Sequence, residues 1–158
     1  MVIDADALNC LAAYSGNGWP KELQGSESTP LILTPHAGEM AHLCGRSKQT
    51  VSADPQGTAL EAARRWNAVV ALKGATTVIA TPDGRLWTHC GGEAGLATSG
   101  SGDTLAGIIG GLAARGATPE QACAWGVVLH AGAGARLASR GPLGFLARYL
   151  EKKWGKGI

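Results

Sequence analysis

The sequence predicts an α/β domain with a mainly parallel sheet, because short apolar runs alternate with longer segments of helical periodicity. The run Ala68–Gly74 is almost continuously apolar, as expected for a strand that helices cover on both faces. By contrast, Leu105, Ile108 and Leu112 recur at the spacing of one helical face. With 158 residues, of which 45% are hydrophobic, the chain is long enough for one domain with a substantial core.

The first half of the chain predicts strands and helices separated by polar, helix-breaking residues. The expected elements, in order, are a strand end at residues 1–4, a helix over 5–14, a loop over 17–30, a buried strand over 31–34 and a helix from near Gly38 to Gly45. A further helix is expected within residues 52–66, where Leu60, Ala63 and Trp66 form an apolar stripe.

The second half predicts a hairpin followed by helices. Residues 77–90 form the hairpin around the turn sequence Pro-Asp-Gly at 82–84. A glycine-rich loop then leads into a helix that ends at Gly116. Thr118 and Gln121 predict a capping box at the start of the next helix. The tail predicts a final amphipathic helix followed by a frayed end.

The bulk properties exclude several classes of protein. The net charge is only +2, and basic residues are scattered, so we expect no nucleic-acid partner. No apolar run approaches the ~18 residues that a membrane span needs. None of the four cysteines lies in a CxxC pair, which disfavours a disulfide framework or a zinc site. We therefore expect reduced thiols in a cytoplasmic protein.

The loop before the predicted helix places Gly100, Ser101 and Gly102 directly before Asp103. Free N–H groups and the helix dipole bind anions at such a position, and glycine lets a phosphate approach the backbone. Asp103 fits two interpretations. It is either an N-cap, stabilising the helix by about 1 kcal/mol, or a general base that takes a proton from a hydroxyl attacking a phosphoryl group. The spacing leaves both open.

Polar residues also follow the first strand end. Asp4, Asp6 and Asn9 occupy the position where open α/β sheets place ligands, with a helix cap as the alternative for Asp6. His89 and His130, like the cysteines, are assigned to packing.

Four segments occur in one order along the chain: VIDADALN, LTPHAGEMAHL, ALKGATTVIATPDG and GLATSGSGDTLAGIIGGLAARG. Together with the tail GPLGFLARYL, they resemble the ADP/ATP-dependent NAD(P)H-hydrate dehydratase family. The resemblance implies a ribokinase-like, three-layer α/β/α fold. It also implies that residues 1–158 are the C-terminal part of a single domain lacking its N-terminal strands and helices. Some family members carry an additional epimerase domain, so a fused or separate epimerase is a possible partner.

The resemblance implies repair of hydrated NADH or NADPH. In that reaction ADP or ATP, with Mg²⁺, phosphorylates the hydrate hydroxyl, and phosphate is then eliminated. Asp103 matches the catalytic base, and a homo-oligomer is expected. The substrate-binding residues implied are Asp103, His36, Ala37, Gly38 and Glu39. The nucleotide-binding residues implied are Lys73, Gly74, Ala75, Thr76, Thr77, Gly95, Leu96, Ala97, Thr98, Ser99, Gly100, Ser101 and Gly102. The Mg²⁺ ligands are not identified.

The sequence departs from the family pattern at two places. Glu93-Ala94-Gly95 stands where the family usually has Asn-Pro-Gly, and the acidic Glu93 puts nucleotide affinity or choice in question. His36-Ala37-Gly38-Glu39 stands where the family usually has His-Pro-Gly-Glu. Two alternatives therefore stay open beside the dehydratase: a ribokinase-like small-molecule kinase, and a truncated module that binds nucleotide without turnover. A snorkelling surface lysine is the alternative for Lys73.

Overall fold

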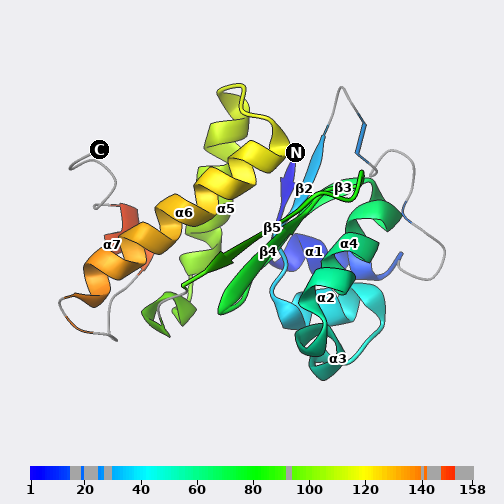
Figure 1. The fold of residues 1–158 in the computed structure, drawn as a ribbon, viewed down its shortest axis with the longest axis horizontal. Coiled ribbons are helices and arrows are strands. Elements are labelled where there is room, and N and C mark those ends of the chain that lie inside the picture. The colour runs from blue at the N-terminus through cyan, green and yellow to red at the C-terminus, as the bar shows by residue number, and fades with distance from the viewer. Residues whose placement is uncertain are drawn as a thin grey trace.

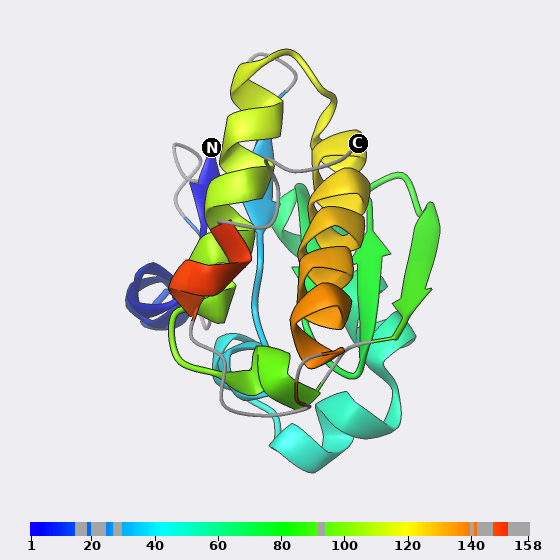
Figure 2. The same cartoon turned by 90° about the vertical axis from the view of Figure 1, so that its left-hand side faces the viewer.

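A five-stranded sheet lies between two layers of helices in the computed structural model (Figures 1 and 2). The structure describes residues 1–14, 19, 25–26, 30–91, 94–139, 141 and 147–151. The strands follow one another across the sheet in the order β1-β2-β3-β4-β5. Their bounds are Val2–Ile3 for β1, Leu31–Leu33 for β2, Ala68–Leu72 for β3, Thr76–Ala80 for β4 and Leu86–Cys90 for β5.

The sheet is mixed. β1, β2 and β3 are parallel, whereas β3 pairs antiparallel with β4, and β4 with β5. The β4–β5 pair is the predicted hairpin, and its turn is stabilised by the Thr81 hydroxyl, which donates to the Asp83 carboxylate and accepts from the Arg85 N–H. All five residues of β3 are buried, which confirms that helices cover both of its faces.

One face of the sheet is covered by four helices. These are α1 (Asp6–Ala12), α2 (Ala37–Cys44), α3 (Lys48–Ala53) and α4 (Pro55–Trp66). They bury the larger core, which includes Leu8, Met40 and Trp66 of these helices and Val70 and Val78 of the sheet.

The helix expected within residues 52–66 is confirmed as α4, but the sequence did not predict the separate helix α3 before it. Pro55 disfavours helical backbone at Asp54, so the chain breaks there and two helices form. The Asp54 side chain accepts a hydrogen bond from the Gly57 N–H at 2.9 Å and caps α4, while Ser47 caps the unpredicted α3.

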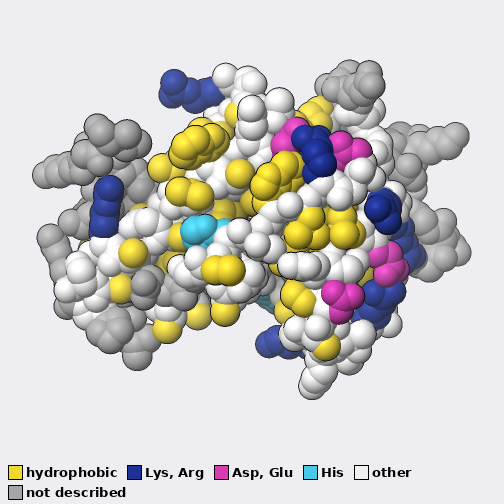
Figure 3. All heavy atoms as spheres, viewed as in Figure 1, with side chains coloured by type: hydrophobic (Ala, Val, Ile, Leu, Met, Phe, Trp, Pro, Cys, Tyr) yellow, Lys and Arg dark blue, Asp and Glu magenta, His cyan; other side chains and the backbone are white. Residues whose placement is uncertain are grey.

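The other face is covered by α5 (Ser101–Ala114) and α6 (Pro119–Ala138), with α7 (Ala147–Glu151) beside them (Figure 2). The capping box of Thr118 and Gln121 forms as predicted. α5 and α6 pack closely at Gly126. A Cβ added there would lie only 2.6 Å from Ile109 Cγ1, so the absence of a side chain allows this approach. Hydrophobic side chains also gather on the outer surface over α6, where Trp125 and Val128 are exposed (Figure 3).

Three predictions fall largely outside the described residues. The loop over 17–30 is described only at Trp19, which stacks on Trp66 with 4.7 Å between ring centroids, and at positions 25, 26 and 30. The tail helix is described only over α7. Glu93 is not among the described residues either. Within the part of the chain that the structure describes, no helix is both long and apolar enough to cross a membrane.

Candidate functional site

A cluster of charged side chains lies at the carboxyl ends of the parallel strands. Asp4 follows β1, Lys73 follows β3, and Glu39 lies in the first turn of α2. The Lys73 ammonium is 2.7 Å from Asp4 Oδ1 and 4.0 Å from Glu39 Oε2. The Lys73 side chain is only 18% exposed, that of Asp4 10% and that of Glu39 12%. Lys73 is therefore a partly buried ion-pair partner, and the interpretation of it as a snorkelling surface lysine is wrong.

His36 is the N-cap of α2. Its Nδ1 accepts hydrogen bonds at 3.0 Å from the backbone N–H groups of Gly38 and Glu39, and Glu39 Oε2 accepts from the His36 N–H at 2.7 Å. This is a capping box in which histidine takes the usual place of serine or threonine. Because Nδ1 is an acceptor, the neutral ring carries its proton on Nε2, which lies 3.3 Å from Glu39 Oε1.

The first turn of α5 lies directly against this charged cluster. A Cβ added at Gly102 would be 3.1 Å from Lys73 Nζ and 3.7 Å from Asp4 Oδ2. Gly100 adopts a φ of +82°, a conformation that favours glycine, and it is the N-cap of α5. Glycine at these two positions therefore allows a tight turn and a close approach, which places backbone N–H groups beside the ammonium.

A cavity of about 550 Å³ opens between this turn, the hairpin and α6. It is lined by His36, Lys73, Gly74, Ala75, Thr77, His89, Ala94, Leu96, Ala97, Thr98, Ser101, Gly102, Leu105, Val127, His130 and Ala131. Its lining combines the lysine, three hydroxyl groups and the helix N-terminus with several apolar side chains. Such a mixture of polar and apolar walls suits a ligand with an anionic group and an apolar body.

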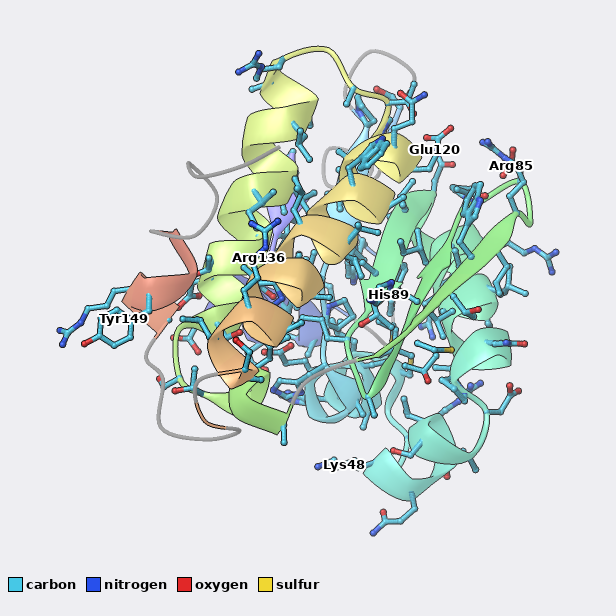
Figure 4. The ribbon with its side chains drawn as sticks, turned by 60° about the vertical axis from the view of Figure 1, so that its left-hand side comes forward. Lys48, Arg85, His89, Glu120, Arg136 and Tyr149 are labelled. Atoms are coloured by element: carbon cyan, nitrogen blue, oxygen red, sulfur yellow. The ribbon has the colours of Figure 1, made fainter. Side chains whose placement is uncertain are left out.

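This cavity is lined by two histidines that the sequence analysis assigned to packing. Figure 4 shows His89 on β5, beside α6. His130 of α6 is buried, and its Nε2 lies 2.9 Å from Ser101 Oγ. Burial lowers the pKa of His130, a hydrogen bond with the backbone of Ser101 opposes this shift, and the nearby Lys73 ammonium adds to it. No sequence signal pairs residues 101 and 130, since they lie 29 positions apart.

Asp103 lies on the exposed side of α5. It is the third residue of the helix, whose N-cap is Gly100, so its interpretation as an N-cap is wrong. Among the described residues, no side-chain hydrogen bond or ion pair engages its carboxylate. Asp103 faces a second, more open hollow of about 640 Å³, which Gly100, Thr104, Gly107 and Arg148 also line. The glycine turn therefore separates two concave surfaces, with Lys73 on one side and Asp103 on the other.

The structure gathers only part of the predicted site into the cavity. Ten predicted residues line it: His36, Lys73, Gly74, Ala75, Thr77, Leu96, Ala97, Thr98, Ser101 and Gly102. Thr76 does not, because alternation along β4 turns it to the other face, where its hydroxyl lies 3.9 Å from Cys90 Sγ. Eight predicted residues do not line the cavity: Ala37, Gly38, Glu39, Thr76, Gly95, Ser99, Gly100 and Asp103.

The residues after β1 have separate roles. Asp4 joins the charged cluster, and Asn9 Oδ1 lies 3.3 Å from His42 Nδ1. Asp6 is the first residue of α1, whose N-cap is Ala5, so the helix-cap interpretation of Asp6 is wrong. All four cysteines are free thiols, as expected. The described residues contain no group of three His, Cys, Asp or Glu side chains that could hold a metal ion.

A family profile described as NAD(P)H-hydrate dehydratase matches residues 1–156. The chain is 50% identical over 146 residues to the ADP-dependent (S)-NAD(P)H-hydrate dehydratase of Xanthomonas campestris pv. campestris, covering 92% of this chain and 50% of that protein. It is 49% identical over 133 residues to the bifunctional NAD(P)H-hydrate repair enzyme Nnr of Moorella thermoacetica, covering 84% of this chain and 24% of that protein.

Among solved structures, the chain is similar to the ADP/ATP-dependent NAD(P)H-hydrate dehydratase of Bacillus subtilis that was co-crystallised with ATP and Mg²⁺. The TM-score is 0.80 at 31% identity, over 98% of this chain and 54% of that one. A ribokinase-like superfamily protein of Enterococcus faecalis V583 is also similar, with a TM-score of 0.73 at 27% identity over 98% of this chain and 50% of that one, which confirms the predicted ribokinase-like α/β class. The chain spans about half the length of the Xanthomonas campestris protein and about a quarter of the Moorella thermoacetica protein.

Proposed function

Because the chain belongs to the NAD(P)H-hydrate dehydratase family, we propose that it takes part in nucleotide-dependent dehydration of hydrated NADH or NADPH. One observation carries the proposal. The glycine turn at the start of α5 lies beside Lys73 at one end of a cavity and presents Asp103 on its opposite side. A phosphoryl group held by this turn would therefore have a positive cradle on one side and a free carboxylate on the other.

The first turn of α5 performs the binding step in this proposal. Its N–H groups and the Lys73 ammonium stabilise the negative charge of the transferring phosphoryl group. The hydroxyl groups of Thr98 and Ser101, both at the cavity wall, are additional donors to phosphate oxygens. Leu96, Leu105 and Val127 of the same cavity provide apolar contacts for the rest of the nucleotide.

Asp103 performs the proton transfer in this proposal. Its carboxylate accepts the proton of the substrate hydroxyl. At the same time the hydroxyl oxygen bonds to the terminal phosphorus of the nucleotide, and the bond from this phosphorus to the rest of the nucleotide breaks. The phosphorylated hydrate then loses phosphate, together with a ring proton, and the double bond is restored. An exposed carboxylate without a competing partner among the described residues is well suited to receive this proton.

Mg²⁺ belongs to the proposal as the ion that accompanies a nucleotide. It is commonly held by substrate phosphates with one or two carboxylates, so the lack of a three-ligand cluster among the described residues is compatible with it. When bound, it would neutralise charge on the phosphates. The same proposal includes four further predictions. Residues 1–158 are the C-terminal part of one domain, the protein forms a homo-oligomer, an epimerase is fused to it or acts as a separate partner, and its location is cytoplasmic.

Recovery of NADH absorbance from hydrated NADH, with ADP and ATP supplied in parallel, tests the activity. Asp103→Asn should leave nucleotide affinity unchanged or tighter, because it removes a negative charge near the phosphates. It should lower turnover by about 10²- to 10⁴-fold, the usual contribution of a general base. If turnover stays within tenfold of that of the unaltered chain, Asp103 is not the general base, and its carboxylate only interacts favourably with the helix dipole.

A second candidate is a nucleotide-binding module without turnover. One observation favours it: Asp103 lies outside the cavity that contains Lys73. Calorimetric titration with ADP distinguishes the two candidates, because binding without NADH recovery supports the module and absence of binding contradicts both. Phosphorylation of an unrelated hydroxyl substrate, without NADH recovery, would instead support the small-molecule kinase.

A further inference from the structure

The glycine turn is joined to the rest of the molecule by a buried hydrogen bond. Ser101, the first residue of α5, is only 2% exposed, and its Oγ lies 2.9 Å from Nε2 of His130. His130 lies near the middle of α6, so the bond links the start of one helix to the body of the next. Both side chains line the cavity that contains Lys73.

The turn has few other anchors. Its N-cap, Gly100, makes no side-chain cap hydrogen bond. The Ser101 N–H donates to the Thr98 carbonyl, and the Thr104 hydroxyl donates to the Gly100 carbonyl, but both bonds stay within the same segment. Among the described residues, Ser101–His130 is the only side-chain hydrogen bond that ties residues 98–104 to another element. A glycine-rich turn without such a tie samples more conformations.

We propose that His130 is a positioning residue, which through Ser101 holds the turn Gly100–Asp103 in the geometry that binds phosphate and directs the Asp103 carboxylate. The inference rests on the proposed function for its catalytic consequence, but the anchoring of the turn does not. His130 acts through Ser101 and need not touch either substrate. Its role is to reduce the conformational freedom of the backbone N–H groups before the ligand arrives.

The surroundings of His130 favour its neutral form. The ionisable side chains that share its cavity are Lys73 after β3, His36 before α2 and His89 on β5, and the neutral Ser101 comes from α5. Of these the ammonium lowers the pKa of His130, as burial does. A neutral imidazole can either donate to or accept from the Ser101 hydroxyl, so the hydroxyl remains free to adjust to a phosphate oxygen.

Three variants separate positioning from packing. Ser101→Ala removes the bond with the smallest change in volume. His130→Phe removes it while keeping a planar ring, and His130→Gln keeps a side-chain nitrogen within reach of Ser101. Ser139→Ala is the matched control, because Ser139 Oγ only donates to the Arg136 carbonyl at the exposed end of α6.

Amide hydrogen exchange of the ligand-free chain tests the anchoring. The Ser101 and Thr104 N–H groups, which donate at 3.2 and 3.1 Å, should exchange about tenfold faster in Ser101→Ala and His130→Phe, as expected for the loss of one hydrogen bond. His130→Gln and Ser139→Ala should remain close to the unaltered chain. Unchanged exchange in Ser101→Ala, or equal loosening in His130→Gln and His130→Phe, would overturn the inference.

A titration of the unaltered chain keeps the test decisive if a variant fails to fold. The imidazole signal of His130 and the amide signal of Ser101 should shift with one common midpoint, below the ordinary histidine value near 6.5. An amide signal of Ser101 that does not follow the titration of His130 would contradict the inference.

Turnover and ADP titration then test the catalytic consequence. Ser101→Ala and His130→Phe should lower kcat about tenfold or more and should also weaken ADP binding, because the turn holds the phosphates, and the double variant should be no worse than the more impaired single variant. Additive losses would overturn the link through Ser101. If no variant, nor the unaltered chain, binds ADP, the proposed function fails, while the exchange result still decides the anchoring.

Discussion

Replacing Lys73 should destabilise the fold more than replacing its closest partner. Lys73→Met leaves Asp4 and Glu39, only 10% and 12% exposed, without the ammonium that compensates them. Asp4→Asn instead leaves Lys73 with Glu39 at 4.0 Å and with a side-chain carbonyl that can still accept a hydrogen bond. The structure thus predicts an asymmetric effect, in which removal of the cation is the more damaging change.

The magnitude follows from burial. Breaking a fully buried ion pair by removing one partner costs about 3–5 kcal/mol, and the partial exposure of this cluster puts Lys73→Met near the lower end, at about 3 kcal/mol. Asp4→Asn should cost about 1.5–2 kcal/mol, the size of one charge-assisted hydrogen bond. For a domain of this length, about 3 kcal/mol corresponds to a fall in melting temperature of roughly 6–12 °C.

Urea unfolding of the single and double variants measures these values by linear extrapolation. The double variant should be more stable than the sum of the two single losses predicts, because the two groups share one interaction. Arg46→Met and Glu61→Gln provide the control, since this pair has similar geometry, 2.8 Å, but is 36% and 55% exposed. Its loss should change stability little.

Three results would refute the reasoning. The first is a larger loss for Asp4→Asn than for Lys73→Met. The second is strict additivity in the double variant. The third is a loss for the exposed Arg46–Glu61 pair as large as that for the buried pair, which would remove burial as the cause.

Three further predictions concern packing, thiol chemistry and pH. Gly126→Ala should destabilise the fold by about 1–3 kcal/mol, measured by thermal unfolding, because the new methyl group would meet Ile109 at 2.6 Å; an unchanged melting temperature would contradict the close helix contact. Burial raises the pKa of Cys123 to about 12, so a thiol-specific reagent at pH 8 should modify the exposed Cys10 and leave Cys123 unreacted until the chain unfolds; mass spectrometry of peptides reports both. Because burial lowers the pKa of His130, the unfolded chain binds this proton more readily; the resulting stability is complete above about pH 6.5 and is lost as the pH falls through the folded-state pKa. His130→Gln should therefore flatten the decline in stability below pH 6.5, and an identical decline in both proteins would show that His130 does not contribute.

Much of the local structure could be predicted because its signals lie within a few residues. The capping box of Thr118 and Gln121 and the hairpin turn at 82–84 are examples. The short helix α3 was missed, although Ser47 is a local signal for its start and Asp54 before Pro55 is a local signal for its end. Family motifs located the glycine turn and Lys73 for the same reason, since each is a short contiguous stretch.

The relations between distant side chains could not be predicted in this way. The sequence by itself determined the alternation of strands and helices, the caps and the glycine turn before Asp103, because these depend on the spacing of near neighbours. Only the tertiary structure joined Lys73 to Asp4, 69 positions away, and His130 to Ser101. It also placed Asp103 and Lys73 on opposite sides of the turn. Such contacts depend on the order of the strands and on which faces of two helices meet, and neither is encoded in the periodicity of any single segment.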